Sequence, residues 1–171
     1  MDEQAKANLI ASIQKQIAEI MQQLTAAKEI LAAKKGINYI TVHHTAGNKT
    51  DTDVNLDKQG ALDGYPKSSL GHTIAYHYFI DWNGAITHAR EDTEFSQHAR
   101  GVSKGNIGIC LACNFMNYSP SLGQLNSLKS LLDSLKAKYY IDNKEIHPHS
   151  YWNNTACPGA YLKDWLNNNY V

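Results

Sequence analysis

The chain has 171 residues, the length of one ordinary domain with a modest extension. Sixteen Lys and Arg balance sixteen Asp and Glu, so the formal net charge is zero, which excludes the global positive field of a non-specific nucleic-acid binder. A hydrophobic content of 43% allows a packed core and excludes wholesale disorder, and no apolar run approaches the ~18 residues that cross a bilayer.

Residues 1–35 differ in composition from the rest, because none of them is His, Cys, Pro or aromatic. Their apolar side chains recur at alternating spacings of three and four, which is a heptad pattern. The stripe consists of Ile10, Ile13, Ile17, Ile20, Leu24, Ala27 and Leu31. Gly36, after two lysines, is a typical C-terminal stop for a helix. We therefore expect an amphipathic helix over about residues 5–34, an extension over residues 1–36, and a domain over residues 37–171.

This helix has two alternative roles. Isoleucine at both core positions of the heptad favours the association of more than two copies. Leu9, Met21 and Ile30 widen the stripe and favour packing on the body of the same subunit. We expect intramolecular packing or a weak self-association. Residues 1–4 are acidic and polar, unlike the start of a secretory signal peptide, so we expect synthesis in the cytoplasm without one.

From residue 37 the pattern is mixed α/β. The segments that read as strands are residues 37–42, 73–81, 85–88, 106–115 and 144–147. Asn83-Gly84 predicts a hairpin turn between the second and third of these. A helix should begin at Ser121, with Gln124 in the capping-box position, and a terminal helix should span residues 160–168. This order predicts a single α/β domain, with one mixed β-sheet flanked by helices.

The three cysteines cannot all pair with one another, so at least one thiol is left for other chemistry. Cys110 and Cys113 lie in an apolar predicted strand, where residues three apart face opposite sides, and we read them as small buried side chains. Cys157 lies in a polar, turn-rich loop eight residues after His149. A thiolate and an imidazole on one irregular segment suit Zn²⁺.

A catalytic zinc site needs three protein ligands and one open position. The third ligand is expected from another strand end, where His43 and His44 follow the first predicted strand. Adjacent strand residues face opposite ways, so only one of the pair can join the metal. His147 and His149 form a second pair of alternatives, and a set of ordinary hydrogen-bonded histidines is the alternative to any zinc site.

Five segments together resemble a known family. They are residues 42–47 (V-H-H-T-A-G), 75–80 (A-Y-H-Y-F-I), 98–101 (H-A-R-G), 107–111 (I-G-I-C-L) and the stretch from His149 to Cys157-Pro158. In this order the set resembles the zinc-dependent N-acetylmuramoyl-L-alanine amidases, which include phage amidase endolysins and peptidoglycan recognition proteins. The resemblance covers about residues 37–170 and does not cover the N-terminal helix.

The resemblance implies one Zn²⁺ per chain, held by His43, His149 and Cys157. It places Tyr76 at the position of the catalytic tyrosine. Thr155 falls where phage members often carry Lys and recognition proteins often carry Thr, and becomes a second candidate donor. His98, in a polar loop, is a candidate contact for glycan or peptide, with a solvated loop as the alternative. We group His44 with it as a substrate contact.

The implied activity is zinc-dependent hydrolysis of the amide between N-acetylmuramic acid and L-alanine in bacterial peptidoglycan. This describes an endolysin-like, bacteriolytic and antimicrobial hydrolase that acts on the cell wall. The alternative is a non-catalytic peptidoglycan-binding module, although such members characteristically lack the cysteine ligand, and Cys157 is present. No nucleic-acid partner and no membrane span are expected.

Several other polar residues read as structural. We expect Asp51, Asp53, Asp57 and Asp63 to be helix caps or solvated acids, and His72, His77 and His88 to be structural. Gly60, Gly64 and Pro66 indicate a loop that forms one wall of a cleft.

Overall fold

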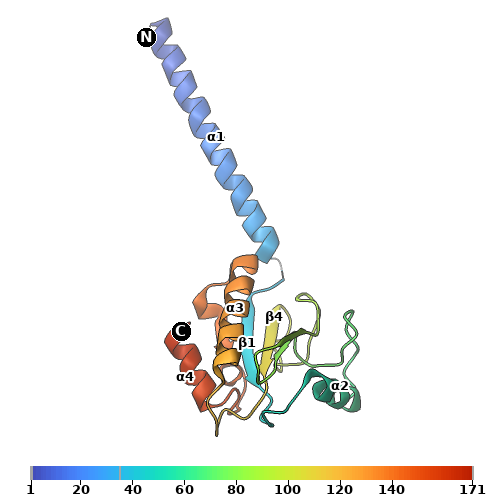
Figure 1. Ribbon diagram of the computed structural model, residues 1–171. Helices are drawn as coiled ribbons and strands as arrows, with labels where there is room; N and C mark the ends of the chain where they lie inside the picture. Colours follow the sequence, from blue (N-terminus) through green and yellow to red (C-terminus); the bar gives the residue numbers. More distant parts are fainter. Residues whose placement is uncertain (1, 35, 171) are drawn as a thin grey trace. The chain divides into compact units, whose positions relative to one another are not determined.

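A computed structural model describes residues 2–34 and 36–170, and the chain divides into two compact units with the boundary after residue 35. The first unit is the helix α1 (Glu3–Lys34) (Figure 1). The carboxylate of Asp2 accepts the backbone N–H of Ala5 at 2.7 Å, which caps the first turn of α1. Within the described residues, no helix is both long enough and apolar enough to cross a membrane.

The second unit is built on a five-stranded sheet with the strand order β3-β2-β4-β1-β5. The strands are β1 (Tyr39–His44), β2 (Tyr78–Ile80), β3 (Ile86–His88), β4 (Asn106–Leu111) and β5 (Ile146–Pro148). β2, β4, β1 and β5 run parallel, and β3 pairs antiparallel with β2. The carboxyl ends of the four parallel strands therefore meet at one edge of the sheet, which is where such sheets bind ligands.

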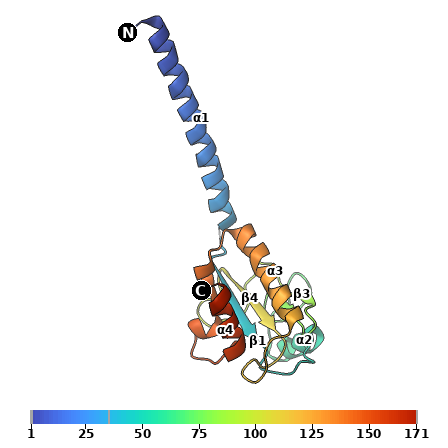
Figure 2. The ribbon, with the colours of Figure 1, turned by 60° about the vertical axis from the view of Figure 1, so that its left-hand side comes forward.

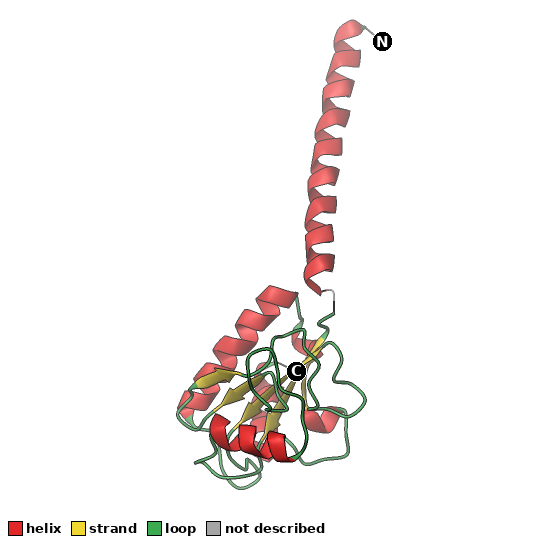
Figure 3. Cartoon of the chain, turned by 90° about the vertical axis from the view of Figure 1, so that its right-hand side faces the viewer, coloured by secondary structure: helices red, strands yellow, loops and turns green. Residues whose placement is uncertain are grey.

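Three helices flank this sheet (Figures 1 and 3). They are α2 (Asp53–Leu62), α3 (Leu122–Tyr139) and α4 (Ala160–Asn169), and two short 3₁₀ helices span Asn143–Glu145 and His149–Tyr151. α3 and α4 lie on the same side of the sheet (Figure 2). Their leucines pack with alternate strand residues such as Val42 and Ile109 in the main core. Phe79 and Cys110, from the other face of the sheet, pack with Leu56 of α2. The predicted fold class, a mixed sheet flanked by helices, is confirmed.

Local sequence signals place several elements correctly. The hairpin turn lies at Asn83-Gly84, where Gly84 has a φ of 94° that favours glycine. The Ser121 side chain accepts the Gln124 N–H, and the Gln124 side chain accepts the Ser121 N–H, which completes the predicted capping box. Cys110 and Cys113 are both buried, and they belong to clusters on opposite faces of the sheet.

Several local predictions were wrong, and β4 ends at Leu111 rather than at residue 115. The strand expected over residues 73–81 forms only at Tyr78–Ile80, because Thr73 instead bonds to Asp57 of α2. Gly60 lies inside α2 rather than in a loop. Glycine is needed there because a Cβ at this position would collide with the Thr73 carbonyl. Asp57 is therefore not a solvated acid, and it also pairs with His72 Nδ1 at 2.6 Å.

Candidate metal centre

Three donor side chains converge at the carboxyl edge of the sheet. His43 lies near the end of β1, His149 follows β5 directly, and Cys157 lies in the loop before α4. Because β1 and β5 are parallel neighbours, their ends lie side by side. One ligand atom from each of these three residues lies within 4.8 Å of the others, and the His43 and His149 rings are 4.4 Å apart. The structure thus brings together the three residues that the family resemblance proposed as ligands.

The tautomer of His43 follows from its hydrogen bonds. The backbone carbonyl of Asn106 can only accept, so His98 donates to it from Nε2, at 2.8 Å. His98 Nδ1 is then an acceptor, and it lies 3.0 Å from His43 Nε2, which must carry the proton. The unprotonated nitrogen of His43 is therefore Nδ1, which lies 3.7 Å from Cys157 Sγ. This lone pair faces the donor cluster.

His149 is held in the same way. Its Nε2 lies 2.9 Å from the side-chain oxygen of Asn153, whose amide nitrogen donates to the Arg100 carbonyl. His149 Nε2 is therefore the donor, and its Nδ1 carries the lone pair. Burial lowers the pKa of His43, helped by His98 and the other nearby histidines, and burial lowers the pKa of His149 against the opposing bond to Asn153. Both imidazoles are neutral at pH 7, as ligation of a cation requires.

Cys157 completes the donor set. Burial raises the pKa of its thiol to about 11, while the bond from the His44 N–H, 3.4 Å from Sγ, opposes this rise. The thiol is protonated without a cation, and a bound metal would displace the proton. Two neutral imidazole nitrogens and one thiolate sulfur match the ligands that Zn²⁺ takes, so these residues fit zinc.

Tyr76 and Thr155 flank this cluster. The Tyr76 ring lies 5.0 Å from the His43 ring. The adjacent Cys110 sulfur and burial raise the pKa of the Tyr76 hydroxyl well above its usual value, so it is a neutral donor. Thr155 Oγ1 accepts the Cys157 N–H at 3.2 Å, and its own proton remains available for donation. Both side chains can donate a hydrogen bond beside the donor cluster.

The expectations for His98 and His44 need correction. Both ring nitrogens of the buried His98 are used by His43 and Asn106, so it supports a ligand and does not present a polar atom to substrate. His44 points to the opposite face of β1, where its Nδ1 accepts the Phe115 N–H at 3.1 Å. Strand alternation therefore places His43 in the donor cluster and His44 on the other face of β1.

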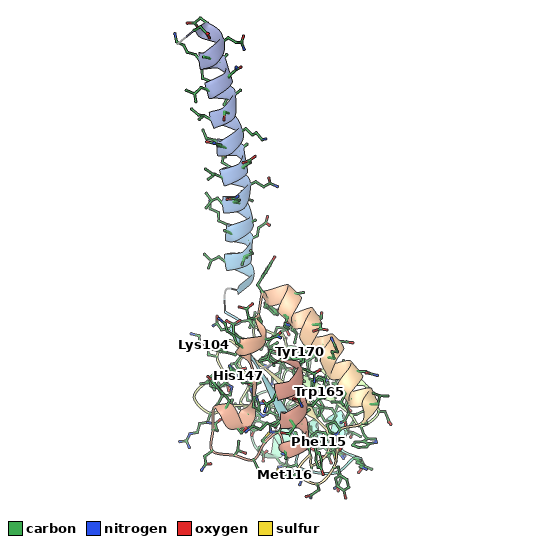
Figure 4. All side chains as sticks on the ribbon, turned by 90° about the vertical axis from the view of Figure 1, so that its left-hand side faces the viewer. Lys104, Phe115, Met116, His147, Trp165 and Tyr170 are labelled. Carbon is green, nitrogen blue, oxygen red and sulfur yellow. The ribbon has the colours of Figure 1, made fainter. Side chains whose placement is uncertain are left out.

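The remaining histidines lie outside the donor cluster. His147 (labelled in Figure 4) stacks on Tyr151, with 3.8 Å between the ring centroids. His77 is buried, and its Nδ1 accepts the Gly108 N–H at 3.0 Å. His88 stacks on Tyr78 at 4.5 Å. These contacts agree with the structural reading of His77 and His88.

A pocket of about 320 Å³ lies between the end of β1 and α2, and Tyr76 lines it. Asn55, Gln59 and Asp63 give it a polar wall along one face of α2. Sequence reasoning missed this wall. The spacing of four between these three polar residues is the signal that could have indicated one helix face.

The fold and the donor set define a class of protein: a small mixed α/β domain with a candidate metal centre at the ends of its parallel strands. The family model described as N-acetylmuramoyl-L-alanine amidase matches residues 33–160. The chain therefore belongs to this family.

Individual relatives agree with this assignment. The endolysin of Escherichia phage T7 is 31% identical over 103 residues, which cover 56% of this chain and 66% of the endolysin, just under two thirds of its length. The solved structure of the N-acetylmuramoyl-L-alanine amidase LysC from Clostridium intestinale matches with a TM-score of 0.66 and 29% identity, over 77% of this chain and 85% of that one. Peptidoglycan recognition protein SD of Drosophila has the same TM-score at 24% identity, over 77% and 79% of the two chains, and shares the fold.

Proposed function

We propose that this protein is a zinc-dependent amidase that hydrolyses the bond between N-acetylmuramic acid and L-alanine in bacterial peptidoglycan. One observation carries the proposal: a ligand atom from each of His43, His149 and Cys157 lies within 4.8 Å of the others, while both imidazoles also bond to the protein through Nε2. Family membership and the similarity to an endolysin and to a solved amidase support the same reaction.

We assign each residue a role that fits the geometry. His43, His149 and Cys157 would hold the zinc, which supplies a Lewis acid that polarises an amide carbonyl and lowers the pKa of water to about 7. His98 and Asn153 keep the two imidazoles in the tautomers that the metal needs.

Tyr76 and Thr155 act on the substrate side. Tyr76, neutral at pH 7 because its pKa is raised, donates to the oxygen that becomes negative as the carbonyl is attacked. Thr155 is a second donor to the same oxygen. We assign the peptide stem to the pocket beside Tyr76, whose polar wall on α2 can bond peptide groups. The attacking water gives its oxygen to the muramic acid carbonyl, the C–N bond breaks, and the L-alanine amine leaves with the proton that the water loses.

A non-catalytic peptidoglycan-binding module is the second candidate function, and the similarity to a recognition protein favours it. Such a module needs the groove but not the three donors. The presence of Cys157 in the donor cluster argues for catalysis.

The test is incubation of zinc-loaded protein with purified bacterial sacculi, followed by labelling of newly exposed L-alanine amines and mass spectrometry of the released peptides. We expect release that stops with a chelator, returns with zinc, and is lost in His149→Ala. His147→Ala is the matched control, because His147 is the neighbouring histidine outside the donor cluster.

Each outcome decides between the two functions. Zinc-dependent release supports the amidase. Binding to sacculi without release of peptides would replace it with the recognition module. Release that is indifferent to the chelator and to His149→Ala would contradict the metal centre.

A further inference from the structure

α1 carries a long apolar stripe that is exposed to solvent. Nine large apolar side chains of this helix are between 38% and 73% exposed, and Figure 4 shows side chains projecting along its whole length. They are Leu9, Ile10, Ile13, Ile17, Ile20, Met21, Leu24, Ile30 and Leu31. A stripe of this size on a 32-residue helix is unusual for a free surface, since soluble proteins rarely expose contiguous apolar patches.

The spacing of the stripe indicates the kind of partner. From Ile10 to Leu31 the core positions alternate in steps of three and four, which is a repeat of 3.5 residues. A straight helix repeats every 3.6 residues, so a strict repeat of 3.5 suits other helices wound around it. The partner that the stripe fits is therefore a helix with the same repeat.

The balance of charges on α1 favours a helix over a membrane surface as its partner. Between Glu3 and Leu31 three lysines (Lys6, Lys15, Lys28) balance three glutamates (Glu3, Glu19, Glu29). A helix that lies on anionic lipid carries an excess of Lys and Arg and often Trp or Phe, and α1 has no aromatic residue.

The residues beside the stripe permit a second copy of the same helix. The positions that flank the core within these heptads are uncharged except for one, and they carry Gln14, Gln16, Met21, Gln23, Lys28 and Ile30. Two or more copies can therefore approach without opposing rows of like charge, which would otherwise repel.

We propose that α1 assembles this protein with further copies of itself through a coiled coil formed by the stripe from Ile10 to Leu31. Isoleucine occupies both core positions in the first two of these heptads, which favours three or four helices over two. The assembly presents several wall-directed domains at once, so on a polymeric substrate it adds avidity without a change in any single site.

The test is sedimentation of the full chain over the micromolar range, with Ile13→Gln/Ile20→Gln as the disrupting variant. Ala11→Gln/Ala18→Gln is the matched control, because it places the same side chain on the opposite side of the helix. We expect the wild type and the control to exceed the monomer mass of 19.1 kDa, and the disrupting variant to sediment as a monomer. Zinc content and near-ultraviolet circular dichroism check that the second unit remains folded in each variant.

Three results would overturn this proposal. The first is a wild type that sediments as a monomer throughout. The second is flotation of a monomeric wild type with anionic vesicles of phosphatidylglycerol, which would make the stripe a lipid-binding face. The third is a monomeric wild type whose second unit melts at lower temperature in the disrupting variant, which would mean packing within one chain. None of these readouts depends on amidase activity.

A separate observation concerns His98. Its ring lies over Gly108 of β4, where a Cβ would approach the ring carbon Cγ to 2.6 Å. The absence of a side chain at Gly108 therefore lets the ring reach both the Asn106 carbonyl and His43 Nε2. We infer that His98 is a positioning residue for zinc, acting through the tautomer of His43, and that Gly108 makes room for it.

Zinc affinity measured by competition with a chromophoric chelator tests this inference. His98→Leu removes the acceptor for His43 and should weaken zinc binding about 10–100-fold, the usual effect of losing such a partner. His98→Asn restores an acceptor near the Nδ1 position and should recover most of the affinity. Gly108→Ala should weaken binding while every polar group is kept. Wild-type affinity in His98→Leu, or equal loss in His98→Leu and His98→Asn, would show that His98 only fills space.

Discussion

Two buried polar clusters in the second unit differ in how they use their hydrogen bonds. The Asp92 carboxylate accepts the hydroxyls of Tyr78 and Tyr139, each at 2.6 Å, and the Lys138 ammonium at 2.7 Å. These bonds tie the loop that holds Asp92 to β2 and α3. Every partner of Asp92 is supplied by the protein, as is usual for a buried charge that stabilises a fold.

In the candidate metal centre, each histidine bonds to the rest of the protein through one ring nitrogen. His43 and His149 each bond to the protein through Nε2, while His43 Nδ1 lies 3.7 Å from the Cys157 sulfur and one ligand atom from each of the three residues lies within 4.8 Å of the others. Imidazole nitrogens and a thiol sulfur that lie this close together are suited to bind a cation. The comparison suggests a general criterion: a structural cluster is complete by itself, and a functional one is complete only with its ligand.

The largest effect should come from Cys157→Ser. The hydroxyl fills nearly the same space but is a poor ligand, so zinc binding should fail and amidase activity should fall at least ~1000-fold. The stability of the metal-free variant should stay within about 1 kcal/mol of the metal-free wild type, because the thiol adds little to folding without the metal. Metal analysis and urea unfolding measure the two quantities. Full activity in this variant would contradict the proposal that the Cys157 cluster, unlike the Asp92 cluster, serves to bind a ligand.

A smaller effect on turnover is expected from Tyr76→Phe. Loss of one donor to the developing oxyanion should lower kcat about 100–1000-fold while zinc content stays at one per chain. Tyr161→Phe is the control, since Tyr161 is exposed on α4 and belongs neither to this pocket nor to the donor cluster. Steady-state kinetics on a soluble muropeptide, together with metal analysis, test this division. A parallel loss of zinc would make Tyr76 part of the metal-binding structure instead.

The smallest of the three effects is on folding. Asp92→Asn should lower the free energy of unfolding by about 2 kcal/mol, because a carboxylate that accepts three hydrogen bonds becomes a neutral amide. Zinc affinity should not change.

The pH dependence of this effect has a definite sign. Burial alone would raise the pKa of Asp92, but Lys138, Tyr139 and Tyr78 outweigh it and hold the pKa below 3.8. The stabilisation is therefore present above about pH 4 and is lost as the pH falls through the pKa of the folded state. Urea unfolding of wild type and variant at pH 4–8 should show a constant gap, and a gap that closes above pH 6 would contradict the role of Asp92.

Much of the fold could be predicted because its signals are local. The heptad stripe of α1, the turn at Asn83-Gly84 and the cap at Ser121 each depend on residues a few positions apart. α2 escaped prediction because it has no clear apolar period and its Gly60 reads as a loop signal. The need for Gly60 depends on Thr73, which approaches α2 from another segment.

The site was only partly predictable, for the same reason. Spacing left His43 and His44 open, and the choice of His43 came from the family resemblance rather than from the residues themselves. In the structure, His43 lies in the donor cluster, whereas His44 bonds to the Phe115 N–H on the opposite face of β1. The role of His98 could not be foreseen, because it depends on the space over Gly108 and on the Asn106 carbonyl. A polar loop in the sequence gives no sign of either.

The position of β5 also governs when the centre can form during folding. His43 and Cys157 are separated by 114 residues in the chain, and His149 follows the strand that pairs with β1 last in sequence order. A nascent chain that has not yet released residues 146–157 holds one donor of the three. In the zinc enzyme that we propose, capture of the ion would therefore follow formation of the complete sheet, and the bound ion would oppose unfolding by mass action. The ion would then stabilise contacts between distant parts of the chain in addition to its part in the reaction.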